Sequence, residues 1–134
     1  ALKSEDAELP GMITAVSMAV SGSDASARAD SQEVAERTLR ALTTGLPENM
    51  GGVVFLSDAQ NPEEGTANLN ALARLEPLPW PIAFCFARAL LEPVLAAWKG
   101  ADENFADAQA VLNQRLALLS RADAAGYSTA LEDF

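Results

Sequence analysis

The residues that could take part in chemistry stand at the ends of two short apolar runs. Asp58 and Ala59 follow the run at residues 52–57, and Ala87 follows the run at residues 81–86. Each run opens directly into a helix-like pattern, as a buried parallel strand does when its carboxyl end leads into a helix. Barrel and doubly wound α/β folds bind ligands at that edge. The two turns are therefore where we expect a binding or catalytic site.

The composition removes several kinds of chemistry. The chain has no histidine, which is the commonest general base and metal ligand. Its single cysteine, Cys85, lies in an apolar run, so we interpret it as a small buried hydrophobic residue rather than a catalytic thiol. The acidic pairs Glu63-Glu64 and Asp102-Glu103 are interpreted as charge at helix N-termini. The sequence thus predicts no metal and no cofactor.

Length and charge restrict the class of protein and of partner. The chain has 134 residues, 49% of them apolar, which predicts one globular domain. Its net charge of −10 argues against binding to nucleic acid and to anionic membranes. No apolar run approaches the roughly 20 residues that span a bilayer, and the first residues lack the pattern of a signal peptide. We therefore expect neither nucleic acid nor a membrane span.

From residue 31 onward, helical and strand patterns alternate along the chain. The expected order is a helix ending at Gly45, a strand at 52–57, a helix at 61–75, a strand at 82–86, a helix at 87–99 and a helix at 102–125. Such alternation predicts parallel strands joined by right-handed crossovers. Residues 12–20 could form a third strand. A sheet this small has open edges, which favour binding of a partner.

The residues of both turns and of the helices after them are similar to those of a known family. The matching sequences are Gly52 to Gln60, Glu63-Glu64, Ala67-Asn68-Leu69-Asn70-Ala71, Trp80, Phe84 to Leu90, Leu95-Ala96-Ala97-Trp98, Gly100, Glu103-Asn104 and Ala108-Gln109. Their order and spacing over residues 47–116 resemble the last two strands and helices of class I fructose-1,6-bisphosphate aldolase, a (β/α)8 barrel. Fold and site can both be inferred from this resemblance.

The resemblance implies a partial (β/α) barrel of two to three parallel strands and about four helices. Residues 1–134 are then a single domain with an aldolase-like core at 31–126, a poorly matched N-terminal segment at 1–30 and a tail at 127–134. Because aldolases of this class occur in cytosol and plastids, we expect a plastid, another organelle or the cytoplasm, and a reducing compartment.

The family's catalytic lysine lies in a Leu-Lys-Pro sequence on the sixth strand and forms a Schiff base with the ketose carbonyl. Leu2-Lys3, followed by Ser4 and then by Leu9-Pro10-Gly11, resembles that sequence. The resemblance makes Lys3 the candidate Schiff-base residue. An exposed lysine at a chain terminus is the alternative interpretation.

The family binds a substrate phosphate through a Ser-Gly-Gly turn and a Gly-Arg pair. Ser57 and Arg88 match their counterparts, whereas Asp58, Ala59 and Ala87 stand where the family has glycine. A Cβ blocks close approach, and many phosphate-binding turns need the positive φ that glycine tolerates. A carboxylate about 4 Å from a phosphate repels each charge by about 4 kcal/mol at an effective dielectric constant near 20. The five residues are therefore interpreted as a vestigial phosphate site.

These changes favour a non-catalytic aldolase-like protein, a pseudoenzyme that acts as an accessory subunit of a larger protein assembly and contacts it through the open sheet edge. One alternative is part of an active class I aldolase that uses Lys3 as its Schiff-base residue and Ser57 and Arg88 as phosphate ligands. Another alternative is a sugar-phosphate binding domain that uses the same three residues.

Overall fold

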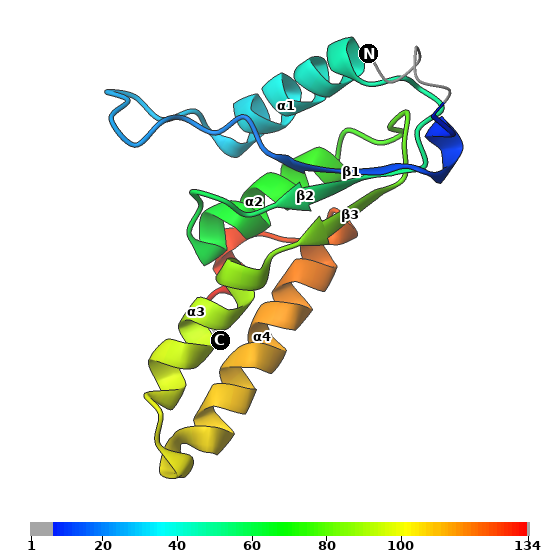
Figure 1. The fold of residues 1–134 in the computed structure, drawn as a ribbon. Helices are drawn as coiled ribbons and strands as arrows, with labels where there is room; N and C mark the ends of the chain where they lie inside the picture. The colour runs from blue at the N-terminus through cyan, green and yellow to red at the C-terminus, as the bar shows by residue number, and fades with distance from the viewer. Residues whose placement is uncertain (1–6, 134) are drawn as a thin grey trace.

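Three parallel strands form the sheet of this protein. The computed structural model describes residues 7–133, and its strands are β1 (Ile13–Ser17), β2 (Gly52–Leu56) and β3 (Ile82–Cys85), in the order β1-β2-β3 (Figure 1). The register places Ala15 of β1, Val54 of β2 and Ala83 of β3 side by side. The partial α/β barrel expected from the sequence is confirmed, and residues 12–20 do contain its third strand.

Four helices accompany the sheet: α1 (Ser31–Gly45), α2 (Pro62–Ala73), α3 (Ala87–Trp98) and α4 (Phe105–Asp123). Short 3-10 turns lie at Leu9–Gly11, Asp102–Asn104 and Thr129–Leu131. Helices α1 and α2 connect the strands, while α3 and α4 form a long hairpin that extends away from the sheet (Figure 1). The expected order of helices and strands agrees with this architecture.

Local sequence explains where α1 and α2 begin. The side chain of Asp30 accepts a hydrogen bond from the backbone N–H of Glu33 at 2.8 Å. Asn61 and Glu64 form a full capping box at the start of α2, because each side chain accepts from the other residue's backbone N–H. These bonds satisfy N–H groups that a helix start otherwise leaves unpaired.

The two faces of the sheet differ in burial. Val53 and Phe55 of the central strand are each 1% exposed and belong to the same core as Leu69 and Leu72 of α2. On the opposite face, alternate residues of the outer strands β1 and β3 are exposed, as expected from the two-residue period of a strand. Cys85 lies on that open face and is exposed. Our expectation of a buried cysteine is therefore wrong, because helices of the described chain cover only one side of β3.

A buried arginine links the C-terminal segment to α2 through hydrogen bonds and an ion pair. Arg115 of α4 is 5% exposed and forms an ion pair with Glu132. Its guanidinium group also donates to the hydroxyl oxygen of Thr66 at 2.6 Å and to the carbonyl oxygen of Pro62 at 2.9 Å. Tyr127 adds a hydrogen bond from its hydroxyl to Glu132 at 2.8 Å. This network joins α2, α4 and the residues after α4.

Neutralising Glu132 should destabilise the chain. In Glu132→Gln, Arg115 remains buried and charged without its counter-charge, which we expect to lower the free energy of unfolding by about 2–3 kcal/mol. Urea unfolding followed by tryptophan fluorescence measures this loss. Glu92→Gln, at an exposed position of α3, is the matched control and should change stability by less than about 0.5 kcal/mol. Equal effects of the two substitutions would contradict the role of the network.

Tyr127 gives the same network a pH dependence. Burial, the hydrogen bond to Glu132 and the charge of Glu132 raise the pKa of Tyr127 above its ordinary value. Above about pH 10 the unfolded chain therefore loses the phenol proton while the folded chain keeps it, so the free energy of unfolding falls as pH rises. Below that pH the residue adds no pH dependence.

Because Tyr127 is the only tyrosine, tyrosinate absorbance follows it directly. We expect Tyr127 of the native chain to ionise well above pH 10. In that range, Tyr127→Phe should abolish the one-proton dependence of the free energy of unfolding on pH. Tyrosinate absorbance appearing near pH 10 while the chain is still folded would show that the phenol is not held in this way.

Candidate functional site

The carboxyl ends of the three strands bring the candidate site together. Register pairs Ser17 of β1 with Leu56 of β2, and Leu56 with Cys85 of β3, so the strands end at one edge. The turns that sequence analysis singled out both leave this edge. The sheet thus places Ser57 and Asp58 next to the end of β1 on one side and the start of α3 on the other.

Ser57 is held in place by the turn that follows β2. It is 4% exposed, and its carbonyl oxygen accepts a hydrogen bond from the backbone N–H of Gln60 at 3.2 Å. A methyl group built on Gly65 of α2 would lie 3.7 Å from the Cβ of Ser57 and 3.5 Å from the ring of Phe86. The first turns of α2 therefore approach both turns of the edge closely.

Asp58 is exposed and has a partner on the neighbouring strand. Its Oδ2 accepts a hydrogen bond from the hydroxyl of Ser17 at 3.2 Å. Sequence reasoning missed Ser17, although a polar residue within the apolar run at 12–20 could have marked the end of a strand. This hydrogen bond orients the Asp58 carboxylate at the carboxyl edge.

The three positions at which glycine is replaced differ in backbone conformation. Ala59 has φ of 59°, in the left-handed region that favours glycine, whereas Ala87 is the first residue of α3 and Asp58 is not among the described residues with positive φ. The turn therefore keeps a glycine-like backbone at residue 59 even though alanine stands there. An L residue in this conformation costs roughly 1–2 kcal/mol. The loss of glycine at 58 and 87 carries no such cost.

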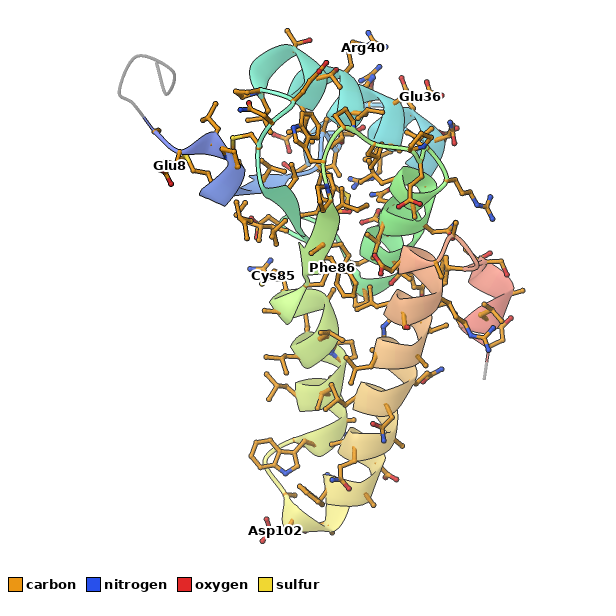
Figure 2. The ribbon with its side chains drawn as sticks, turned by 90° about the vertical axis from the view of Figure 1, so that its right-hand side faces the viewer. Glu8, Glu36, Arg40, Cys85, Phe86 and Asp102 are labelled. Atoms are coloured by element: carbon orange, nitrogen blue, oxygen red, sulfur yellow. The ribbon has the colours of Figure 1, made fainter. Side chains whose placement is uncertain are left out.

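The β3–α3 junction presents Arg88 to solvent. Phe86 is 1% exposed and Cys85 is exposed, and the two side chains point to opposite sides of the chain (Figure 2). Phe86 also contacts Phe84, with ring centroids 5.5 Å apart. Arg88 lies in the first turn of α3, is exposed, and takes part in none of the ion pairs between described residues. Its guanidinium group is available to an anion at this edge.

No lysine stands on the three strands of the sheet. The chain has two lysines, of which Lys99 ends α3 at the distal end of the helical hairpin, and Lys3 lies outside the described residues. Because β1 is the strand that precedes and pairs with β2, it takes the place that the resemblance gives to the lysine-bearing strand. That strand carries no lysine, and the assignment of Lys3 as the Schiff-base residue stays a prediction.

The remaining described residues show which chemical groups the chain offers. Over residues 7–133, no three histidine, cysteine, aspartate or glutamate side chains come together as metal ligands. Among the helices of the same residues, none has the length and apolar character that crossing a membrane requires. The carboxyl edge offers a buried hydroxyl, a hydroxyl–carboxylate pair and an exposed guanidinium group.

Comparison with known proteins gives a consistent result. The family model "Fructose-bisphosphate aldolase class-I" matches residues 1–133. The chain is 40% identical over 116 residues to "Probable fructose-bisphosphate aldolase class 1" of Xylella fastidiosa strain 9a5c, covering 86% of this chain and 35% of that protein. It is 39% identical over 115 residues to fructose-bisphosphate aldolase of Plasmodium falciparum isolate K1, covering 86% of this chain and 32% of that protein.

A solved structure agrees with the sequence comparison. Fructose-bisphosphate aldolase from Plasmodium falciparum, in complex with TRAP and a small-molecule inhibitor, superimposes with a TM-score of 0.81 and 38% sequence identity. The match covers 87% of this chain and 33% of that chain. The chain thus spans about a third of the length of these relatives.

These findings correct our functional prediction. We expected a non-catalytic accessory subunit, a pseudoenzyme, whereas the relatives bear the name of the enzyme. That prediction depended on the preserved packing residues, on the open sheet edge and on the three replaced glycines. Of those three positions, Ala59 keeps a left-handed backbone and Ala87 has none. With a family model matched over residues 1–133 and relatives near 40% identity, the chain belongs to the class I fructose-bisphosphate aldolase family.

Proposed function

We propose that this chain is part of a class I fructose-bisphosphate aldolase, which cleaves or forms a carbon–carbon bond of a ketose phosphate through a Schiff base. The observation that carries the proposal is the family match over residues 1–133, together with relatives near 40% identity that are named as this enzyme. The chain supplies three adjacent strands whose carboxyl ends form one arc of the active-site edge.

In this proposal the arc binds a substrate phosphate. Ser57 donates its hydroxyl hydrogen, and burial in the turn keeps it in one position. Arg88 supplies a positive charge and several donors, which suit phosphate oxygens. Gly65 lets the first turns of α2 approach Ser57 closely. The hydroxyl and guanidinium donors together match the chemistry of a phosphate dianion.

Asp58 places a negative charge near the same phosphate. Its carboxylate lies beside Ser57 along the chain and is oriented by the hydroxyl of Ser17. Because Asp58 is exposed, water and salt screen its repulsion of a phosphate. In the proposed enzyme, Asp58 therefore weakens phosphate binding while Ser57 and Arg88 provide it.

The amine of the proposed enzyme is Lys3. A lysine amine attacks a ketose carbonyl, water is lost, and the resulting iminium withdraws electrons from the bond that breaks. The unpaired outer edges and open face of β1 and β3 are then covered by the other strands of the enzyme's barrel. This arrangement surrounds the carboxyl edge with the catalytic groups that the described residues do not supply.

Borohydride trapping tests the proposed function. When the protein is incubated with fructose 1,6-bisphosphate and sodium borohydride, we expect a stable adduct on the peptide that contains Lys3, read by mass spectrometry. Lys3→Met should lose the adduct and the aldol cleavage activity. Lys99→Met, at the distal end of the helical hairpin, is the matched control and should keep both. An adduct absent from Lys3 would overturn the assignment, and phosphate binding without an adduct would favour a sugar-phosphate binding domain.

Removing the charge of Asp58 tests the phosphate site separately. Asp58→Asn keeps the size of the side chain and removes its repulsion, so we expect fructose 1,6-bisphosphate to bind about tenfold more tightly at low salt. The gain should shrink as ionic strength rises. Calorimetric titration measures both effects.

The control for this substitution is Asp102→Asn. Asp102 lies at the far end of the α3–α4 hairpin from the sheet (Figure 2), so its charge should not affect binding. An equal gain in affinity from both substitutions would mean that only net charge matters. No gain from Asp58→Asn would place the phosphate away from the turn after β2.

A further inference from the structure

Ser17 and Asp58 form a polar pair at the β1 end of the carboxyl edge. The hydroxyl of Ser17 donates a hydrogen bond to Oδ2 of Asp58 at 3.2 Å, and both residues are exposed. Alternate residues of β1 are exposed, which places Ser17 on the same open face of the sheet as Ile13 and Ala15. A ligand can therefore reach the pair from the side of the sheet that the described helices leave uncovered.

The pair offers acceptors and no spare hydrogen. Asp58 forms none of the ion pairs between described residues, and its Oδ1 accepts no hydrogen bond from them. The single hydroxyl hydrogen of Ser17 is donated to Asp58, so the oxygen of Ser17 can only accept further bonds. A ligand group that donates a hydrogen bond suits such a pair, whereas an anionic group does not.

The opposite charge stands at the other end of the same edge. Arg88 follows β3 in the first turn of α3, whereas the Ser17–Asp58 pair lies between β1 and β2. Neighbouring strands of a sheet are about 4.8 Å apart, so the outer strands β1 and β3 are separated by about 10 Å. A phosphorylated sugar of a few carbons can span this distance, with its phosphate toward Arg88 and another part toward Asp58.

Hydroxyl groups are the donors that a ketose phosphate brings to this edge. Each hydroxyl has one hydrogen to donate, and a carboxylate has room for about four such bonds on its two oxygens. Hydrogen bonds to an ionised acceptor are shorter and stronger than those between neutral groups. Bonds from sugar hydroxyls to Asp58 would thus offset part of the repulsion that its carboxylate exerts on the phosphate.

We propose that the Ser17–Asp58 pair determines specificity by binding hydroxyl groups of a phosphorylated sugar. Asp58 accepts hydrogen bonds from the sugar, and Ser17 is a positioning residue that holds the carboxylate toward β1. The inference rests on the proposed function, because it takes the carboxyl edge as the substrate site. It gives Asp58 a second effect, which is to favour phosphorylated sugars over phosphate compounds without hydroxyl groups.

Two phosphate monoesters that differ in their hydroxyl groups test the proposal. Mannitol 1-phosphate carries several hydroxyl groups and no carbonyl, so it cannot form a Schiff base, whereas methyl phosphate carries no hydroxyl on carbon. Titration of the whole chain with each monoester, followed by nitrogen-15 NMR, gives the ratio of their affinities. The repulsion between Asp58 and the phosphate is common to both monoesters and cancels in this ratio. We expect the unchanged chain to prefer mannitol 1-phosphate.

Substitutions assign this preference to the pair. Asp58→Ala removes the acceptor and should lower the preference for mannitol 1-phosphate at least about fivefold. Asp58→Asn should keep more of the preference, because its amide oxygen still accepts. Asp102→Ala, at the far end of the α3–α4 hairpin, is the matched control and should leave the preference unchanged. Ser17→Ala should lower the preference in the same direction as Asp58→Ala, and Ser17→Thr should retain it because the hydroxyl is kept.

The outcomes separate this inference from the proposed function. The same preference in the unchanged chain and in Asp58→Ala would overturn the inference and leave the phosphate site in place. An equal loss in Asp58→Ala and Asp102→Ala would also overturn it, because the effect would then be one of net charge. Failure of both monoesters to bind would overturn the inference together with the proposed phosphate site. Schiff-base trapping on a ketose uses neither monoester, so its result stands apart from these.

Discussion

Parallel pairing of β1 and β3 with the central strand β2 is the constraint on which the rest of this structure depends. The register Ser17–Leu56–Cys85 makes three segments far apart in sequence end at one edge. Burial of Val53 and Phe55 against the helical layer fixes which face of β2 points inward, since a shift of one residue would reverse every side chain. Through this pairing, Ser57 and Asp58 lie next to the end of β1, and Arg88 follows the end of β3 at the same edge.

The same pairing explains the two different sides of the sheet. Helices α1 and α2 cover one face, and the other face presents Ala15, Ala83 and Cys85 without cover from the described chain. Parallel sheets are usually buried on both faces, so this exposure fits a chain that spans about a third of its relatives' length. The carboxyl ends of the three strands consequently form an arc, and none of these strands carries a lysine.

Polar contacts help to fix the chain segments around the edge. The capping box of α2 and the Gln60–Asn68 pair hold the turn after β2, and the Arg115 network attaches the C-terminal segment to the same helix. Buried polar groups of this kind are strong only when each has its partner. Among the described residues, Gln60 Nε2 and Arg115 Nε are exceptions, because each is buried without a hydrogen-bond partner.

By itself, the sequence determined the order of helices and strands, the start of α2 at Asn61 and membership of the aldolase family. These follow from local signals, namely apolar periodicity, capping residues and a matching order of residues. Tertiary structure decided what depends on contacts between distant segments. It paired Ser17 with Asp58, exposed Cys85 at an uncovered edge strand and left Gln60 with an unpaired donor. It also showed that, of the three replaced glycines, only the one at Ala59 lies in a glycine-like conformation, which a residue's identity cannot reveal.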